Sequence, residues 1–324
     1  MQMGDSMQGL KFPKVILGTM NFGKQVDEKN ADKMVRIFLD RGYREVDTAH
    51  LYGNGLTEEI LGRILARSLR EEVYLATKVS PQIGEGLKPE QVRKQLEISL
   101  RRLKTEYIDL LYLHAPDPKT PIEQTLEACE NLRREGKLRD LGLSNYAAWQ
   151  VVDIWHKCNR NGWVEPNVYQ GMYNSITRDV ERELFPAIRV LGIKFYAYNP
   201  LAAGFLTGKY SDRERKPLVG RFALQQVYVE RYWKETYFKA MNVIRSALEE
   251  NELMLADYSL RWMKHHSLIK GTSGDGFIVG ASNLDQFENN LKSCDSGRLP
   301  ESLITAFDNA WEIVRPECPQ YFRT

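Results

Sequence analysis

The chain has 324 residues, of which 43% are hydrophobic, and this is enough apolar material for a sizeable buried core. Its 45 basic and 43 acidic residues nearly balance, with a formal net charge of +2. This balance, without any long Lys/Arg block, argues against nucleic acid or an anionic membrane as the main partner. No apolar run approaches the ~18 residues of a membrane-spanning helix. Residues 1–10 are polar and lack the apolar stretch of a secretory signal.

The cysteine positions are scattered and include no C-x-x-C pair. They are Cys129, Cys158, Cys294 and Cys318. Zinc sites and disulfide frameworks both need recurrent close spacing. The favoured interpretation is therefore a set of ordinary reduced cysteines in a cytoplasmic protein.

Short β-branched runs alternate with helical patterns along the chain. The predicted strands cover 14–18, 43–47, 72–78, 107–114, 138–144, 167–170, 192–198 and 276–280. Apolar residues at helical spacing predict helices at 27–40, 57–69, 89–103, 121–135, 146–161, 179–191 and 235–250. Such alternation indicates a parallel sheet, and eight strand–helix units close into a barrel. We therefore predict an α/β fold, a (β/α)8 TIM barrel, as a single domain over residues 1–324.

The segment from about 200 to 234 departs from the strand–helix pattern. Its glycines and Pro217 are followed by an aromatic cluster of Phe222, Tyr228, Tyr232 and Trp233. Long loops in compact domains often act as lids. The aromatic side chains favour a lid over the active site, which in this fold lies at the carboxyl ends of the strands.

Polar residues stand at the ends of three successive predicted strands. Asp47, with Tyr52 shortly after it, follows the second strand, Lys78 ends the third and His114 ends the fourth. In a barrel these ends converge. An ammonium lowers the pKa of a nearby phenol, a carboxylate holds the ammonium, and an imidazole can orient a carbonyl oxygen. Together they can polarise a carbonyl group and protonate it while a hydride reaches its carbon.

Each of these residues also has a structural explanation when it is taken alone: an ion pair, a packed aromatic ring or a core histidine. Their joint position at converging strand ends favours the catalytic interpretation. A metal site formed by His50, Asp47 and His114 is disfavoured, because Lys78 would repel a cation.

The string Asp47-Thr-Ala-His-Leu-Tyr52-Gly, with Lys78 and His114, resembles the catalytic tetrad of the aldo-keto reductase superfamily. Supporting strings are Leu17-Gly-Thr-Met-Asn21, Gly142-Leu-Ser-Asn145 and Gly280-Ala-Ser282. A narrower resemblance links the chain to the aflatoxin-aldehyde and succinic-semialdehyde reductase branch. It rests on Tyr112-Leu-His-Ala-Pro-Asp117, Val168-Tyr-Gln-Gly-Met-Tyr-Asn174, Phe195-Tyr-Ala-Tyr-Asn-Pro-Leu201, Leu206-Thr-Gly-Lys-Tyr210 and Glu317-Cys-Pro-Gln-Tyr-Phe-Arg323.

The resemblance implies NADPH-dependent reduction of an aldehyde or ketone, with Tyr52 as proton donor. It implies that the nicotinamide end is held by Ser144, Asn145, Gln170 and Tyr198. The pyrophosphate and adenosine parts would contact Asn199, Leu201, Gly204, Lys209, Arg221, Gly280, Ser282, Gln286, Asn289 and Asn290. The substrate would contact Met20, Tyr228, Arg231 and Arg323, and two arginines would suit a carboxylate-bearing aldehyde.

Several alternatives stay open at this stage. No arginine follows Ser282, which leaves dual use of NADPH and NADH open. The protein could be a biosynthetic reductase with a bulky substrate, or a regulatory subunit that resembles the cofactor-binding auxiliary subunits of potassium channels. The expected partner is a small carbonyl compound, with no metal. A homodimer is one oligomeric state that is compatible with the sequence.

Overall fold

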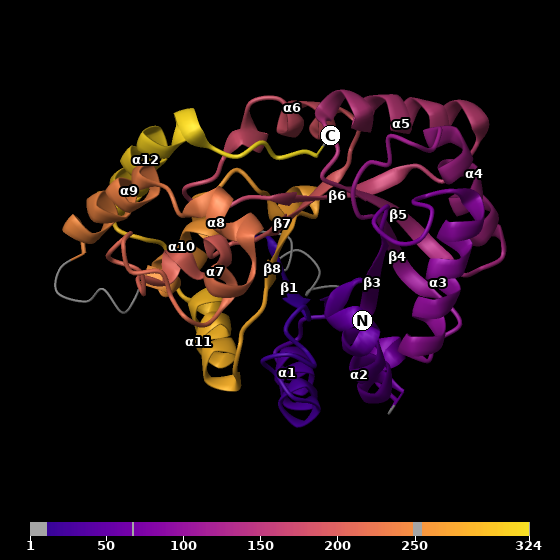
Figure 1. The fold of residues 1–324 in the computed structure, drawn as a ribbon, viewed down its shortest axis with the longest axis horizontal. Coiled ribbons are helices and arrows are strands. Elements are labelled where there is room, and N and C mark those ends of the chain that lie inside the picture. The colour runs from indigo at the N-terminus through magenta and orange to yellow at the C-terminus, as the bar shows by residue number, and fades with distance from the viewer. Residues whose placement is uncertain (1–11, 67, 249–254, 324) are drawn as a thin grey trace, which may run out of the picture.

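The computed structural model describes residues 12–66, 68–248 and 255–323, and its parallel strands close into one barrel (Figure 1). The strands are β1 (Lys14–Gly18), β2 (Glu45–Asp47), β3 (Tyr74–Val79), β4 (Ile108–Leu113), β5 (Leu138–Ser144), β6 (Pro166–Met172), β7 (Lys194–Tyr198) and β8 (Gly276–Val279). Each strand pairs with its sequence neighbours, and β8 returns to β1. The predicted fold class is therefore confirmed.

Helices cover the outside of the barrel. They are α1 (Glu28–Asp40), α2 (Leu56–Leu65), α3 (Pro89–Leu103), α4 (Ile122–Arg134), α5 (Ala148–Asn161), α6 (Leu184–Val190), α9 (Glu235–Ser246), α10 (Leu255–His265), α11 (Leu284–Asp295) and α12 (Glu301–Val314). The first seven match predicted helices, although α2 and α9 end early, and residues 249–250 of the predicted 235–250 helix lie outside the described residues. The segment predicted as one helix over 179–191 begins as a 3-10 turn, Asp179–Glu181, before α6.

The helices α10, α11 and α12 lie outside the helical ranges predicted from the sequence. Their signals are present in the chain, because α12 buries Leu303, Phe307 and Val314 at helical spacing. Asn283 also caps α11, its side chain accepting a hydrogen bond from the Gln286 amide at 2.9 Å. No helix among the described residues has the length and apolar character needed to cross a membrane.

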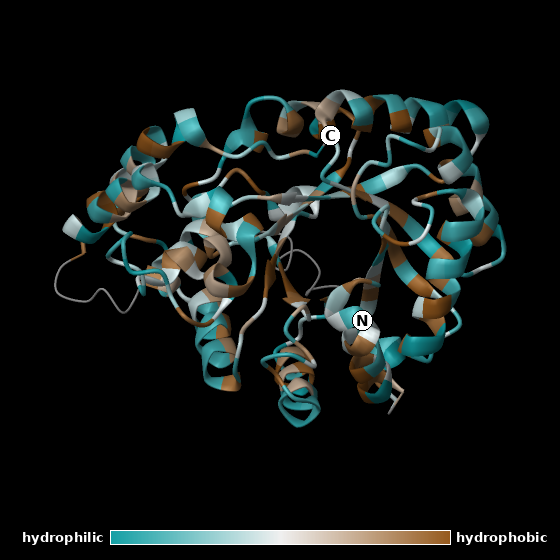
Figure 2. Cartoon of the chain, viewed as in Figure 1, coloured by the Kyte–Doolittle hydropathy of each residue, from teal (hydrophilic) through white to brown (hydrophobic). Residues whose placement is uncertain are grey.

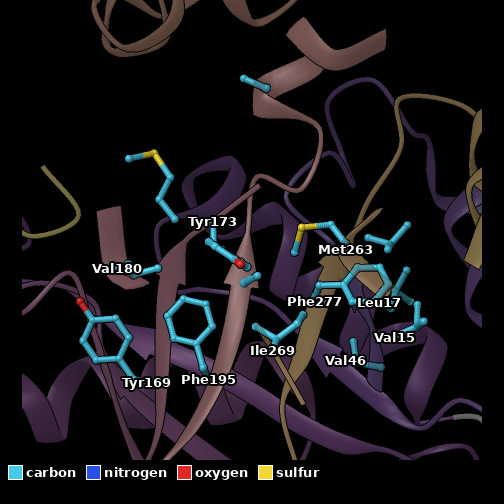
Figure 3. Packing of buried hydrophobic residues seen from close by; sticks show 14 of the residues in the cluster. Val15, Leu17, Val46, Tyr169, Tyr173, Val180, Phe195, Met263, Ile269 and Phe277 are labelled. Atoms are coloured by element: carbon cyan, nitrogen blue, oxygen red, sulfur yellow. The ribbon is translucent and has the colours of Figure 1, made fainter. Parts of the chain in front are cut away.

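The core has two layers, because successive side chains of a strand point to opposite faces. The barrel interior holds Ile16, Ala76, Leu110, Tyr112, Val168 and Tyr196. The larger layer lies between the strands and the helices, and Figure 3 shows part of it. There the rings of Tyr169 and Phe195 stack with centroids 6.0 Å apart. The helices in Figure 2 carry both hydrophilic and hydrophobic residues, as expected for helices with one face on the barrel.

The segment after β7 packs as an aromatic cluster beside the barrel. It contains a 3-10 turn (Ala202–Thr207) and the short helices α7 (Arg221–Leu224) and α8 (Gln226–Tyr232). Phe222 and Trp233 pack against Phe205 and against each other, with centroid separations of 5.2–6.4 Å. The Trp233 indole also donates to the Arg213 carbonyl at 2.8 Å. These contacts fix the segment next to the carboxyl ends of the strands (Figure 1).

The close approach of β5 to the barrel interior requires a glycine at position 142. A Cβ there would lie 2.5 Å from the Tyr112 ring and 3.2 Å from the Val168 carbonyl oxygen. We predict that Gly142→Ala lowers the free energy of unfolding by about 1–3 kcal/mol, because overpacking forces the ring or the strand to move. Urea unfolding measures the change. Gly297→Ala is the control, because its Cβ would have no heavy atom within 4 Å. Equal stability of the two variants would contradict this packing.

Candidate active site

A buried ion pair lies at the carboxyl ends of β2 and β3. Lys78 Nζ lies 2.5 Å from Asp47 Oδ1 and donates to the Thr48 carbonyl at 2.7 Å, and the Lys78 side chain is 0% exposed. The second oxygen of Asp47 accepts from Gln170 Nε2 on β6 at 2.7 Å. Burial lowers the pKa of Lys78, and the contact with Asp47 acts against that shift. The pair is thus held by side chains and backbone of three strands.

Tyr52 lies above this pair on a 3-10 turn, Tyr52–Gly55, which follows β2. Its ring centroid is 5.2 Å from Lys78 Nζ and 6.3 Å from the His114 ring, which it meets edge to face. Burial raises the pKa of Tyr52 well above its ordinary value, and the negative charge of Asp47 adds to this. The pKa of Tyr52 therefore lies above its ordinary value, and not below it as the nearby ammonium of Lys78 led us to expect, because burial is the largest cause of the shift. The phenol stays protonated at neutral pH, as a proton donor must.

His114, just after β4, is a neutral imidazole in this environment. Burial, together with the positive charges of Lys78 and Arg323, lowers its pKa to about 3. Its Nδ1 atom has no hydrogen-bond partner among the described residues. A neutral imidazole has one N–H group, which can donate to a carbonyl oxygen.

A hydrogen-bond network links the neighbouring strand ends. Asn145, with a positive φ of 64°, donates from Nδ2 to the His114 carbonyl at 2.8 Å and to Ser144 Oγ at 2.9 Å. The Tyr198 hydroxyl donates to Asn145 Oδ1 at 2.8 Å. The structure therefore brings Ser144, Asn145 and Tyr198 together, whereas the Gln170 side-chain amide donates to Asp47.

The described residues enclose a cavity of about 630 Å³ at the carboxyl ends of the strands. Its wall includes three of the predicted catalytic residues, Asp47, Tyr52 and His114. The predicted cofactor and substrate residues in the wall are Met20, Ser144, Asn145, Gln170, Tyr198, Asn199, Leu201, Gly204, Lys209, Arg221, Tyr228, Arg231, Gly280, Ser282, Gln286, Asn289, Asn290 and Arg323. Lys78 lies behind the wall.

Some wall residues were not predicted from the sequence. They include Thr19, Asn21, Gln25, Tyr210, Gln225, Val227 and Ile278. A signal existed for Thr19 and Asn21, because both belong to the string that follows the first strand. Gln225 and Val227 lie in the segment that was predicted to form a lid, but no motif in that segment pointed to these two residues.

One end of the cavity lies at the N-terminus of α11. There Ser282 Oγ donates to Gln286 Oε1 at 2.7 Å, and Asn290 Nδ2 donates to the Gly280 carbonyl at 3.3 Å. Backbone N–H groups at the start of a helix favour an anionic ligand. This arrangement suits the phosphate-bearing end of a dinucleotide.

Three arginines line the cavity, and two of them lie beside Tyr228. The guanidinium carbons of Arg221 and Arg231 lie 5.6 and 5.9 Å from the Tyr228 ring centroid. Arg323 comes from the C-terminal segment, which runs from α12 back to the barrel (Figure 1), and its amide donates to the Asn145 carbonyl at 2.9 Å. Arg231 and Arg323 both act to lower the pKa of Tyr198, although burial raises that pKa overall. Both charges therefore lie near the same hydroxyl.

The possible metal ligands have other surroundings. His50 Nδ1 lies 3.1 Å from Ser99 Oγ, and Asp47 is paired with Lys78. Within residues 12–66, 68–248 and 255–323, no group of three His, Cys, Asp or Glu side chains is arranged to hold a metal ion.

Comparison with known proteins identifies the class of protein that this barrel and site define. The model of the Aldo/keto reductase family matches residues 14–312, so the chain belongs to that family and is an oxidoreductase of carbonyl compounds. Aflatoxin B1 aldehyde reductase member 2 of Mus musculus is 48% identical over 322 residues, which span 96% of this chain and 88% of the relative. Aflatoxin B1 aldehyde reductase member 4 of Homo sapiens is 46% identical over 321 residues, which span 96% and 97%. The predicted resemblance to this branch is thus confirmed.

The low pKa of His114 gives a prediction about pH. Its imidazole should remain neutral from pH 8 down to pH 5, because the pKa of about 3 lies below that range. An NMR titration of the His114 ring, assigned by comparison with His114→Gln, should show no protonation step between pH 5 and 8. A step near the ordinary histidine value of ~6.5 would contradict the buried position next to Lys78.

Proposed function

We propose that this chain reduces aldehydes or ketones to alcohols with NADPH, and that Tyr52 donates the proton. The observation that carries the proposal is a protonated Tyr52 that faces a neutral His114 above the buried Lys78–Asp47 pair. All of these residues except Lys78 line a cavity long enough to reach from the catalytic end to α11.

The residues along this cavity fit a dinucleotide. Asn199, which follows β7, lies in the cavity wall next to Tyr198. Gly204 has a φ of +98°, and a Cβ there would meet no heavy atom within 4 Å, so the chain leaves its surface open to a ligand. Tyr198 presents its ring to the cavity, while Lys209 and Arg221 supply positive charge for phosphate.

The protein's own groups can perform the proton transfer. Bound NADPH would supply a hydride to the carbonyl carbon. The neutral His114 would donate a hydrogen bond that orients the carbonyl oxygen, and Tyr52 would transfer its hydroxyl proton to that oxygen. The nearby ammonium of Lys78 would stabilise the resulting phenolate, while Asp47 keeps that ammonium in position.

We also propose that Arg221 and Lys209 favour NADPH over NADH, because the extra phosphate carries the charge that these residues can bind. The segment over 200–234 would act as the lid, since it contributes both residues and Tyr228 to the cavity wall.

A cytoplasmic location is supported by the cysteines, which are free. Burial raises the pKa of all four thiols to about 12, so they are poorly reactive.

We predict that Tyr52→Phe lowers kcat for aldehyde reduction by about 10²–10⁴-fold, because the variant loses only the proton-donating hydroxyl. NADPH affinity, measured by quenching of protein fluorescence, should stay close to wild type. Tyr43→Phe serves as the control, because Tyr43 bonds to Asp295 away from the cavity. Near wild-type turnover by Tyr52→Phe would show that another group donates the proton.

The paired arginines lead us to propose a carboxylate-bearing aldehyde as a favoured substrate. Arg231 and Arg323 reach the cavity from different segments and both lie near Tyr198. Two guanidinium groups can clamp a carboxylate through charge-assisted hydrogen bonds. A carboxylate a few carbons from the reacting carbonyl group could then bind while the carbonyl oxygen faces Tyr52.

We predict that wild type prefers succinic semialdehyde to uncharged butanal in kcat/KM. Arg231→Ala and Arg323→Ala should each lose about 10–100-fold of kcat/KM for the acid, since a charged hydrogen-bond pair contributes about 1.5–3 kcal/mol. Butanal, the internal control, should change little. If the wild-type enzyme has the same kcat/KM for both aldehydes, the proposal that Arg231 and Arg323 bind a carboxylate is refuted. A bulky neutral carbonyl compound then becomes the better candidate substrate.

A further inference from the structure

A second ion pair, between a buried carboxylate and a partly buried arginine, lies behind the turn that carries Tyr52. Glu58, in the first turn of α2, has a 0% exposed side chain, and its Oε2 accepts from Arg102 Nη1 of α3 at 3.2 Å. Its Oε1 accepts from the Thr77 hydroxyl at 2.7 Å. Thr77 precedes Lys78 on β3, and neighbouring side chains of a strand point to opposite faces. Glu58 thus contacts the outer face of the strand whose inner face carries Lys78.

Arg102 contacts the turn on both sides of Tyr52. The same Nη1 atom that meets Glu58 donates to the His50 carbonyl at 3.3 Å. The Arg102 guanidinium also covers Gly55, where a Cβ would lie 2.3 Å from the Arg102 Cζ atom. Arg102 therefore contacts the segment 50–55 near its beginning and at its end.

This turn has little regular structure of its own. Gly53, Asn54 and Gly55 have φ values of +59°, +54° and +99°, so three successive residues are left-handed. Inside the segment 50–55, the Asn54 amide donates to the Leu51 carbonyl at 3.2 Å, and one backbone bond joins the segment to β3, from the His50 amide to the Lys78 carbonyl at 3.2 Å. A short left-handed turn is not held by a repeating hydrogen-bond ladder, so its position relative to β3 depends on contacts with neighbouring elements.

Arg102 is itself held firmly against α2. A Cβ on Gly62 would lie 2.1 Å from the Arg102 carbonyl oxygen, so only glycine permits this approach of α2 to the end of α3. The position of the guanidinium is therefore set by the packing of the two helices. Neither Arg102 nor Glu58 belongs to the cavity wall.

We propose that Arg102 and Glu58 are positioning residues, whose ion pair holds the segment 50–55 against β3 and keeps the Tyr52 hydroxyl opposite Lys78 and His114. The inference rests on the proposed role of Tyr52 as proton donor. Arg102 acts on Tyr52 through the His50 carbonyl and Gly55, and Glu58 links Arg102 to β3 through Thr77. The charge of Glu58 also opposes the effect of burial on the pKa of Lys78.

The test compares Arg102→Met with Arg70→Met. Arg70 forms a similarly buried pair with Asp109, at 3.0 Å and with side chains 12% and 3% exposed, but it precedes β3 at the amino end of the strands. Both variants should lower Tm. Only Arg102→Met should lower kcat for aldehyde reduction, by about 10²-fold, since a small misplacement of a catalytic group has an effect of that size. The KM for the aldehyde should change far less than kcat.

Hydrogen exchange provides a readout that does not depend on activity. The amides of residues 50–55 should exchange at least about 10-fold faster in Arg102→Met and at the wild-type rate in Arg70→Met. Equal kcat in the two variants, or unchanged exchange over 50–55, would overturn the proposal.

Arg102→Lys decides the question if the methionine variant does not fold. Lysine keeps the positive charge but lacks the planar guanidinium that covers Gly55 while its Nη1 atom contacts Glu58 and the His50 carbonyl. Its kcat and its protection of residues 50–55 should fall together, to values between those of wild type and Arg102→Met. Wild-type kcat in the lysine variant would overturn the proposal. A wild-type enzyme without any aldehyde reduction would instead contradict the proposed function, and the exchange measurement would still show whether Arg102 holds the turn.

Discussion

The buried pair of Lys78 and Asp47 is the interaction on which the rest of the site depends. A fully buried ammonium is costly unless its charge is paired and its hydrogen bonds are satisfied. Asp47 and the Thr48 carbonyl provide two partners, and Gln170 satisfies the remaining carboxylate oxygen. These bonds require β2, β3 and β6 to end at matching levels along the barrel axis. The register of the strands and the geometry of the site therefore depend on each other.

The same pair explains the charge states above it. Burial raises the pKa of Tyr52, and the negative charge of Asp47, which pairs with Lys78, adds to that shift, so the phenol stays protonated. Burial, together with the positive charges of Lys78 and Arg323, keeps His114 neutral. The cavity therefore presents an O–H group and an uncharged imidazole side by side. Both are suited to a neutral carbonyl group, which gains electron density on oxygen as it is reduced.

Much of this arrangement could be predicted from sequence, because strand–helix alternation and converging polar strand ends are local patterns with long-range consequences. The eight strands and the grouping of Asp47, Lys78 and His114 are of this kind. The direction of the Tyr52 pKa shift could not be predicted in this way. It depends on how completely the Tyr52 side chain is buried and on the nearby charge of Asp47, and both are properties of the packed structure. The partner of Gln170 depends on the same local geometry.

The role inferred for Arg102 and Glu58 has no comparable sequence signal. Arg102 stands in an ordinary charged stretch of α3, and Glu58 looks like a surface residue in the first turn of a helix. Their meeting depends on the absence of a side chain at Gly62 and Gly55, two positions far apart from Arg102 in the chain. Only the packed structure shows that a buried pair supports the turn of Tyr52.

A double-mutant cycle on the Lys78–Asp47 pair tests the central claim most directly. The kcat for aldehyde reduction is measured for wild type, Lys78→Met, Asp47→Asn and the double variant, with NADPH affinity as the control for folding. If the pair works as one unit, the double variant should lose about as much kcat as the more damaging single variant. Losses that multiply, so that the double variant's loss equals the product of the two single losses, would show that Lys78 and Asp47 act independently and would contradict the account.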